Sequence, residues 1–225
     1  MAEDPPIPLK TRMLRRYEAE PTVFATEGGD PPMELFSPFG PMIGRYRLPQ
    51  PLLDQLNTFA DSQIKPATSS EFLVPDSIVY EGEKRSLGYL TAHWIARYLQ
   101  AVDQIPVKGV NFENFWVVSQ YAGTPSPVHF HSSDVSGVLY LKLPEVENEE
   151  EQDSLTYISG RQAGYINFIT GGRQPFSKSV VSFKPAIGDF YLFPGWLLHG
   201  AEPFQGKGER RSLAFNATIT FEEIA

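Results

Sequence analysis

The chain has 225 residues, of which 41% are apolar and 20% are charged, and this composition excludes a mostly disordered protein. Its formal net charge of −8 argues against nucleic acid as a partner, and no apolar run approaches the roughly 20 residues of a membrane helix. The absence of cysteine excludes disulfides, thiolate metal sites and cysteine nucleophiles, and it fits a reducing compartment. We therefore expect a cytoplasmic protein without membrane contact.

The N-terminal half predicts an arm followed by a strand and two helices. Residues 1–33 hold six prolines and show little periodicity, which predicts an extended arm. Residues 42–48 alternate as a strand does, whereas residues 50–64 and 86–105 place apolar side chains at helical spacing. We expect both helices to lie outside a sheet, and assign residues 34–110 to elements that pack on a barrel.

The sequence changes character after residue 110. Clusters of Gly, Pro and Ser separate eight short stretches that are typical of strands, which predicts a sandwich or barrel rather than alternating β and α units. These stretches are residues 114–121, 127–131, 136–143, 154–158, 165–169, 178–183, 189–193 and 210–220. We therefore expect a mainly β fold, with residues 111–225 as the core of one domain overall.

Three of the four histidines fall in this β-rich half. His129 and His131 are two residues apart in a predicted strand, and residues at i and i+2 project from the same face. His199 follows the turn-like segment FPGWLL, and a jelly roll can bring it opposite the first pair. Three imidazole nitrogens with open positions suit Fe(II), Zn²⁺ or Cu²⁺. An H-x-H pair alone is a weak indication, because single histidines on strands are usually structural or exposed.

The last predicted strand offers an anion-binding face. Arg210, Ser212 and Asn216 alternate onto one side of it, while Arg211 falls on the other. A guanidinium in a cavity binds a carboxylate through a forked, charge-assisted pair, and Ser212 can donate beside it. Only one of the two arginines can point inward, so we assign Arg210 to the cavity and expect Arg211 in solvent.

These motifs, in this order, resemble the 2-oxoglutarate- and Fe(II)-dependent oxygenases, in particular the prolyl-hydroxylase-like members. The resemblance rests on the H-x-H pair, SGVLYLKLP, GDFYLFPGWLLHG and ERRSLAFN, and it covers residues 111–220. It implies a double-stranded β-helix, which is a jelly roll with the metal inside one mouth. It also implies an enzyme that uses Fe(II) and 2-oxoglutarate to hydroxylate a substrate, with release of succinate and CO2.

The resemblance implies roles for individual residues at the metal. His129 and His199 match the two histidine ligands of the family, whereas His131 stands where the family usually has Asp or Glu. We favour His131 as the third ligand. Asp134, the nearest carboxylate, is the alternative if the chain turns after His131.

The resemblance also implies how 2-oxoglutarate is held. Arg210 matches the family arginine that grips the distal carboxylate, and Ser212 lies two residues further on. Tyr140 matches a tyrosine that touches the same carboxylate in prolyl-hydroxylase-like members, although a buried core aromatic is an equal interpretation. We expect no catalytic group beyond the metal ligands.

Two other functions remain open at this point. A cupin-like metalloenzyme would use the three histidines without a keto acid. A non-catalytic jelly-roll module would carry the histidines as remnants or as core residues. The expected partner is a small molecule or a protein side chain, with no nucleic acid, and a homodimer stays open.

Overall fold

The structure is a computed structural model in which strands dominate. It describes residues 22–24, 31–36, 40–64, 68–103, 106–146, 163–171 and 179–221. Of the described residues, 47% lie in strands and 18% in helices. The mainly β fold predicted from the sequence is therefore confirmed.

Eight strands form one large antiparallel sheet in the order β1-β2-β3-β12-β8-β15-β7-β4. The strands span β1 Thr22–Phe24, β2 Met33–Phe36, β3 Ile43–Arg47, β4 Ser70–Val74, β7 Val107–Gln120, β8 Val135–Lys142, β12 Asp189–Pro194 and β15 Arg210–Phe221. The long strands β7 and β15 are neighbours over nearly their full lengths. Because β15 also pairs with β8, the centre of the sheet joins the segments that carry most of the predicted site.

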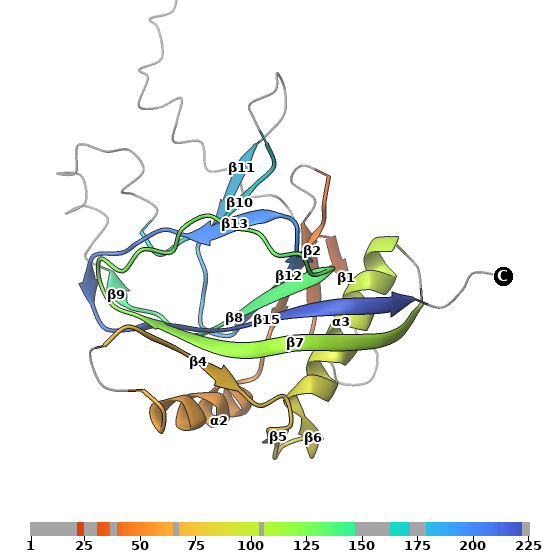
Figure 1. Ribbon diagram of the computed structural model, residues 1–225, viewed down its shortest axis with the longest axis horizontal. Coiled ribbons are helices and arrows are strands. Elements are labelled where there is room, and N and C mark those ends of the chain that lie inside the picture. Colours follow the sequence, from red (N-terminus) through yellow and green to blue (C-terminus); the bar gives the residue numbers. More distant parts are fainter. Residues whose placement is uncertain are drawn as a thin grey trace, which may run out of the picture.

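A smaller sheet completes the jelly roll. It has the strand order β11-β10-β13, and its strands span β10 Ile166–Ile169, β11 Val180–Phe183 and β13 Leu198–Ala201. Figure 1 shows this sheet on one side of β7, β8 and β15, with helix α2 on the other. Two short ladders join β5 Val79–Tyr80 to β6 Arg85–Ser86 and β9 Glu145–Val146 to β14 Gly206–Lys207.

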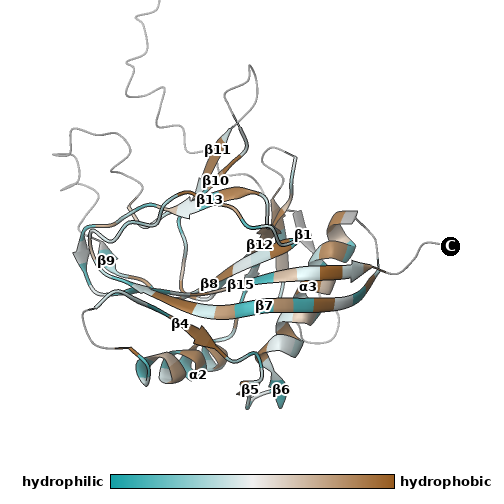
Figure 2. Cartoon of the chain, viewed as in Figure 1, coloured by the Kyte–Doolittle hydropathy of each residue, from teal (hydrophilic) through white to brown (hydrophobic). Residues whose placement is uncertain are grey.

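Two helices cover the outer face of the large sheet. Helix α2 spans Gln50–Asp61 and buries Leu52, Leu53, Leu56 and Ala60, and helix α3 spans Leu87–Asp103. Both helices contribute to one apolar core with Phe115, Val117 and Leu213 of the sheet. Figure 2 shows brown, apolar segments on these strands and on the helices, among white and teal ones. The helical spacing in the sequence follows from this burial, because only one stripe of each helix meets the sheet.

Parts of the prediction differ from the structure. Residues 127–131 form no extended strand, and only His129 pairs there, in an isolated bridge with His199. Pro125 and Pro127 have no backbone N–H, so the chain here cannot donate the hydrogen bonds of a regular strand ladder. The predicted strand at residues 154–158 and most of the predicted arm lie outside the described residues. None of the described helices is long and apolar enough to cross a membrane.

Candidate metal centre

The backbone brings the three histidines together. His129 and His199 exchange two N–H···O hydrogen bonds, each 2.9 Å long, and the His131 N–H donates to the Gly195 carbonyl at 2.9 Å. The segment from His129 to His131 therefore runs antiparallel to the turn that leads into β13. This pairing fixes all three imidazoles at one end of the barrel before any ligand binds.

The imidazoles form a compact cluster of nitrogen donors. One ligand atom from each of His129, His131 and His199 lies within 4.8 Å of the others. The ring centroids are 4.9 Å apart for His129 and His131, 4.5 Å for His129 and His199, and 5.2 Å for His131 and His199. The geometry therefore allows all three side chains to face one ion.

Backbone carbonyls select the tautomer of two of these rings. The Nδ1 atom of His129 lies 2.9 Å from the Pro127 carbonyl oxygen, and that of His199 lies 2.8 Å from the Leu197 carbonyl oxygen. A carbonyl oxygen can only accept, so each Nδ1 carries the proton and donates it. The lone pair is then on Nε2 in both rings, as a metal ligand requires.

The surroundings keep two of the imidazoles neutral. The pKa of His199 is lowered to about 4, mainly by burial; the hydrogen bond to the Leu197 carbonyl opposes this shift, and the two neighbouring histidines add to it. Burial also lowers the pKa of His131, and His129 acts in the same direction. Neutral rings at pH 7 have free lone pairs, so a cation meets ligands that need not lose a proton first.

A cavity of about 340 Å³ adjoins the histidine cluster, a volume within the range of small-molecule sites. Aromatic rings support the imidazoles from its walls. The Trp116 ring lies 6.2 Å from the His131 ring in an edge-on arrangement, and the Phe193 ring lies 4.6 Å from the His199 ring. The side chains that face the cavity include those of Val138, Tyr140, Ile166, Arg210 and Ser212.

Arg210 lies in this cavity, and only 2% of its surface is exposed. Its Nε and Nη2 atoms donate to Gln120 Oε1 at 3.1 and 2.5 Å, and Nη1 donates to the Glu202 carbonyl at 2.9 Å. Both acceptors are neutral, and no carboxylate among the described residues pairs with the guanidinium. Burial lowers the pKa of Arg210 from 12.5. A buried cation without an anion is costly, so the arrangement suits an anionic ligand.

Tyr140 and Ser212 line the same cavity from neighbouring strands. They are directly opposed in the pairing of β8 with β15, and directly opposed residues point to the same face. Tyr140 is 2% exposed, and its burial raises its pKa to about 12. The phenol therefore stays protonated at neutral pH and can donate a hydrogen bond to an acceptor in the cavity.

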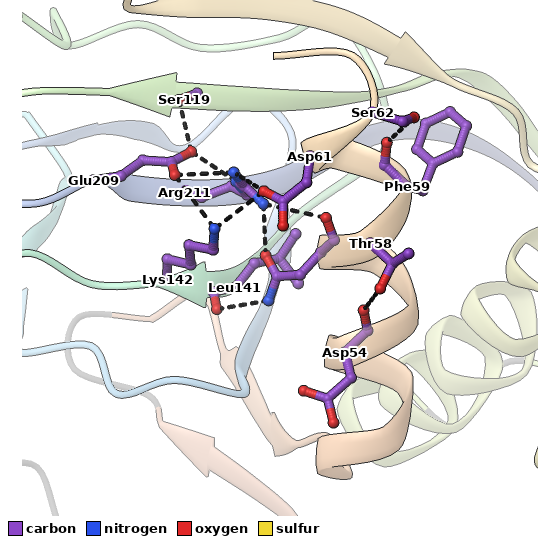
Figure 3. Close-up of polar contacts among 11 residues, drawn as sticks. Asp54, Thr58, Phe59, Asp61, Ser62, Ser119, Leu141, Lys142, Glu209 and Arg211 are labelled. Atoms are coloured by element: carbon purple, nitrogen blue, oxygen red, sulfur yellow. Dashed lines mark hydrogen bonds and ion pairs between the residues drawn. The ribbon is translucent and has the colours of Figure 1, made fainter. Parts of the chain in front are cut away.

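Arg211 faces the opposite side of the sheet, but it is not in solvent as the sequence suggested. Its side chain forms ion pairs with Asp61 at 2.7 Å and with Glu209 at 2.6 Å, and it donates to Asn57 Oδ1 at 2.9 Å (Figure 3). Ser119 Oγ donates to the same Glu209 carboxylate at 2.7 Å. The expectation of a solvated Arg211 is wrong because helix α2 covers this face and supplies polar partners.

Asp134 does not join the histidine cluster. Its Oδ2 atom accepts a hydrogen bond from the Ile219 backbone N–H at 2.8 Å, and its own N–H donates to Ala217. Among the described residues, the group that could hold an ion consists of the three histidines alone. Asp134 thus ties the loop after His131 to β15.

Sequence reasoning missed two residues that shape the site. Gln120 orients Arg210, and it lies opposite Arg210 in the pairing of β7 with β15. Trp116 supports His131 from the same face of β7. Neither residue has a motif of its own, and only the strand register places them at the cavity.

A family model described as "Putative 2OG-Fe(II) oxygenase" matches residues 114–216, the segment that carries the histidines and Arg210. Residues 114–216 are thus similar to the 2OG-Fe(II) oxygenase family. The resemblance inferred from the motifs is therefore confirmed, and the chain is an enzyme of the oxygenase class. The family is named for 2-oxoglutarate and Fe(II), the two cofactors predicted from the sequence. No curated protein matches the chain by sequence.

Several solved oxygenases share the fold of this chain. The 2-oxoglutarate complex of a viral collagen prolyl hydroxylase from Paramecium Bursaria Chlorella virus-1 is 16% identical, with a TM-score of 0.51 over 79% of this chain and 96% of that one. A Pseudomonas putida prolyl-4-hydroxylase is also 16% identical, with a TM-score of 0.51 over 79% of this chain and 92% of that one. HygX from Streptomyces hygroscopicus with nickel and 2-oxoglutarate bound is 11% identical, with a TM-score of 0.51 over 81% of this chain and 84% of that one. At these identities the likeness shows the jelly-roll fold alone.

Proposed function

We propose that the protein is a dioxygenase in which His129, His131 and His199 hold Fe(II) and Arg210 binds the distal carboxylate of 2-oxoglutarate. The observation that carries the proposal is the meeting of three imidazoles and a buried guanidinium around one cavity. The family match supports the same two cofactors. The two alternatives, a metalloenzyme that ignores 2-oxoglutarate and a non-catalytic module, have no comparable support.

The donor set fits Fe(II). Imidazole nitrogens are suitable ligands for this ion, and the lowered pKa values of His131 and His199 keep both rings neutral. Three neutral ligands leave the full charge of the ion uncompensated, which favours an anionic cosubstrate beside it. When bound, Fe(II) and 2-oxoglutarate together supply the chemistry that consumes O2, releases succinate and CO2, and hydroxylates a C–H bond of the substrate.

In this proposal the protein positions 2-oxoglutarate and excludes water from the cavity. Gln120 and the Glu202 carbonyl hold the Arg210 guanidinium in one orientation, so its free N–H groups are already directed at the place of a carboxylate. Tyr140 stays protonated and Ser212 carries a hydroxyl, so both can donate to the same anion. Apolar side chains on the walls keep the cavity dry, which strengthens these charge-assisted hydrogen bonds.

The proposal is tested by measuring succinate formed from 2-oxoglutarate by the purified full-length chain. We expect turnover that requires both Fe(II) and 2-oxoglutarate and that stops when a chelator removes the metal. Tight metal binding without succinate would point instead to the cupin-like alternative. Failure to bind metal at all would point to a non-catalytic module. The assay follows succinate rather than the oxidised substrate, so the substrate, a small molecule or a protein side chain, need not be identified in advance.

A further inference from the structure

A second hollow adjoins the cavity at the edge of the large sheet. It also has a volume of about 340 Å³, and its lining includes Phe72, Leu73 and Asn114. Glu71 and Trp116 line both spaces. The two hollows therefore meet at these side chains, and a ligand in the metal cavity can extend past them into the second space.

The strand register shows that this is one continuous surface. Glu71 lies opposite Val118, and Leu73 lies opposite Trp116, in the pairing of β4 with β7. Val118 is in turn opposite Ser212 in the pairing of β7 with β15. Directly opposed residues share a face, so the face that carries Ser212 in the cavity continues across β7 to the edge strand β4.

Charge divides this surface into two ends. Besides the three histidines, the Asp, Glu, Lys and Arg side chains that line the metal cavity are Glu71 and Arg210. Arg210 is buried, whereas Glu71 is exposed, and no base among the described residues pairs with its carboxylate. The two carboxylates of 2-oxoglutarate are attracted to the arginine and repelled by Glu71. The part of the cavity beside Glu71 therefore remains available to the substrate that is oxidised.

We propose that Glu71 and Trp116 select a substrate that carries a positively charged group beside an apolar or aromatic part. This inference rests on the oxygenase function proposed above, since it concerns the second reactant of the same cavity. The carboxylate forms a charge-assisted hydrogen bond with an ammonium or guanidinium group, and the indole ring adds a cation–π contact. Leu73, which is 66% exposed in the second hollow, supplies apolar surface. A free amine and a Lys or Arg side chain of a polypeptide share this chemistry.

Three probes with one carbon skeleton and different charges test the inference. They are 3-phenylpropylammonium, 3-phenylpropan-1-ol and 3-phenylpropionate, and their dissociation constants are measured by NMR titration of the full-length chain loaded anaerobically with Fe(II) and 2-oxoglutarate. We expect the ammonium probe to bind roughly three- to tenfold more tightly than the alcohol, and the carboxylate to bind most weakly. In Glu71→Gln the ammonium preference disappears, and in Glu71→Lys the carboxylate becomes the preferred probe.

Glu113→Gln is the matched control, because it removes the same charge from an exposed position on β7 that lines neither hollow. Equal affinities for the three probes, or an equal loss of preference in the Glu113 variant, would overturn the inference. A capped dipeptide, Ac-Phe-Lys-NH2, distinguishes the two sources of the cation. Tighter binding of the dipeptide than of the free amine assigns the cation to a polypeptide, and the reverse order assigns it to a small molecule.

The same samples separate this inference from the proposed function. If the unmodified protein forms succinate from 2-oxoglutarate but shows no charge preference, the role of Glu71 is wrong and the oxygenase function stands. If the charge preference is present in the metal-free chain and no succinate forms on loading, the cation site stands and the oxygenase function is wrong. Circular dichroism spectra of each variant show whether the fold is retained.

Discussion

Replacement of Arg210 by alanine should sharply raise the concentration of 2-oxoglutarate that the enzyme requires. A guanidinium has five N–H donors. Three of them are occupied by Gln120 and the Glu202 carbonyl. One N–H on each terminal nitrogen therefore remains, and these two donors are available to the oxygens of a carboxylate.

The size of the effect is taken as the net loss of one charged hydrogen bond, which is its lower bound. Hydrogen bonds to charged groups contribute about 1.5–3 kcal/mol, which corresponds to a roughly 10- to 150-fold higher KM for 2-oxoglutarate. Arg210→Lys should recover part of this loss, since it restores the charge but not the fork. The assay is succinate formation as a function of 2-oxoglutarate concentration, with iron content as the control. An unchanged KM in the alanine variant would refute the reasoning, and Arg211 could not explain it, because its side chain faces helix α2.

Three further outcomes follow from the structure. His199→Ala should abolish Fe(II) binding, and unchanged iron content by metal analysis after anaerobic loading would contradict the ligand assignment. His131→Ala should weaken Fe(II) binding, whereas Asp134→Asn should leave it unchanged, because only His131 lies in the histidine cluster. The opposite result would identify Asp134 as the third ligand. Arg211→Ala should lower the free energy of unfolding in urea by about 1.5–3 kcal/mol, because the mostly buried Glu209 loses its guanidinium partner and keeps only Ser119 and Lys142, whereas Asp61→Asn, at an exposed carboxylate, should lower it by about 1 kcal/mol or less. Equal decreases in the free energy of unfolding for Arg211→Ala and Asp61→Asn would contradict the argument that the buried ion pair with Glu209 contributes more than the exposed one with Asp61.

The alternation of residues along strands made much of this site predictable. A period of two separates Arg210 from Arg211, and the structure has this arrangement. His129 and His131 lie in one cluster, although their segment forms no extended strand. The sequence also indicated the strand-rich half and the two helices, because each buries one regular apolar face.

Long-range pairing limited the rest of the prediction. The partner of Arg210 is Gln120, a residue 90 positions away, and nothing local marks it. The bridge between His129 and His199 likewise depends on how a proline-containing loop meets a distant turn. Strand β4, which carries Glu71, is a five-residue edge strand, and its pattern is too short to stand out from the surrounding loops.

Arg210 and Arg211 are adjacent on β15, and their side chains lie on opposite faces of the sheet. One peptide unit separates Arg210, which lines the cavity, from Arg211, which forms an ion pair with Asp61 of α2. A shift of that helix would therefore displace the residue next to Arg210. If Arg210 binds 2-oxoglutarate as proposed, substitutions on the exposed side of α2 should alter the affinity for 2-oxoglutarate.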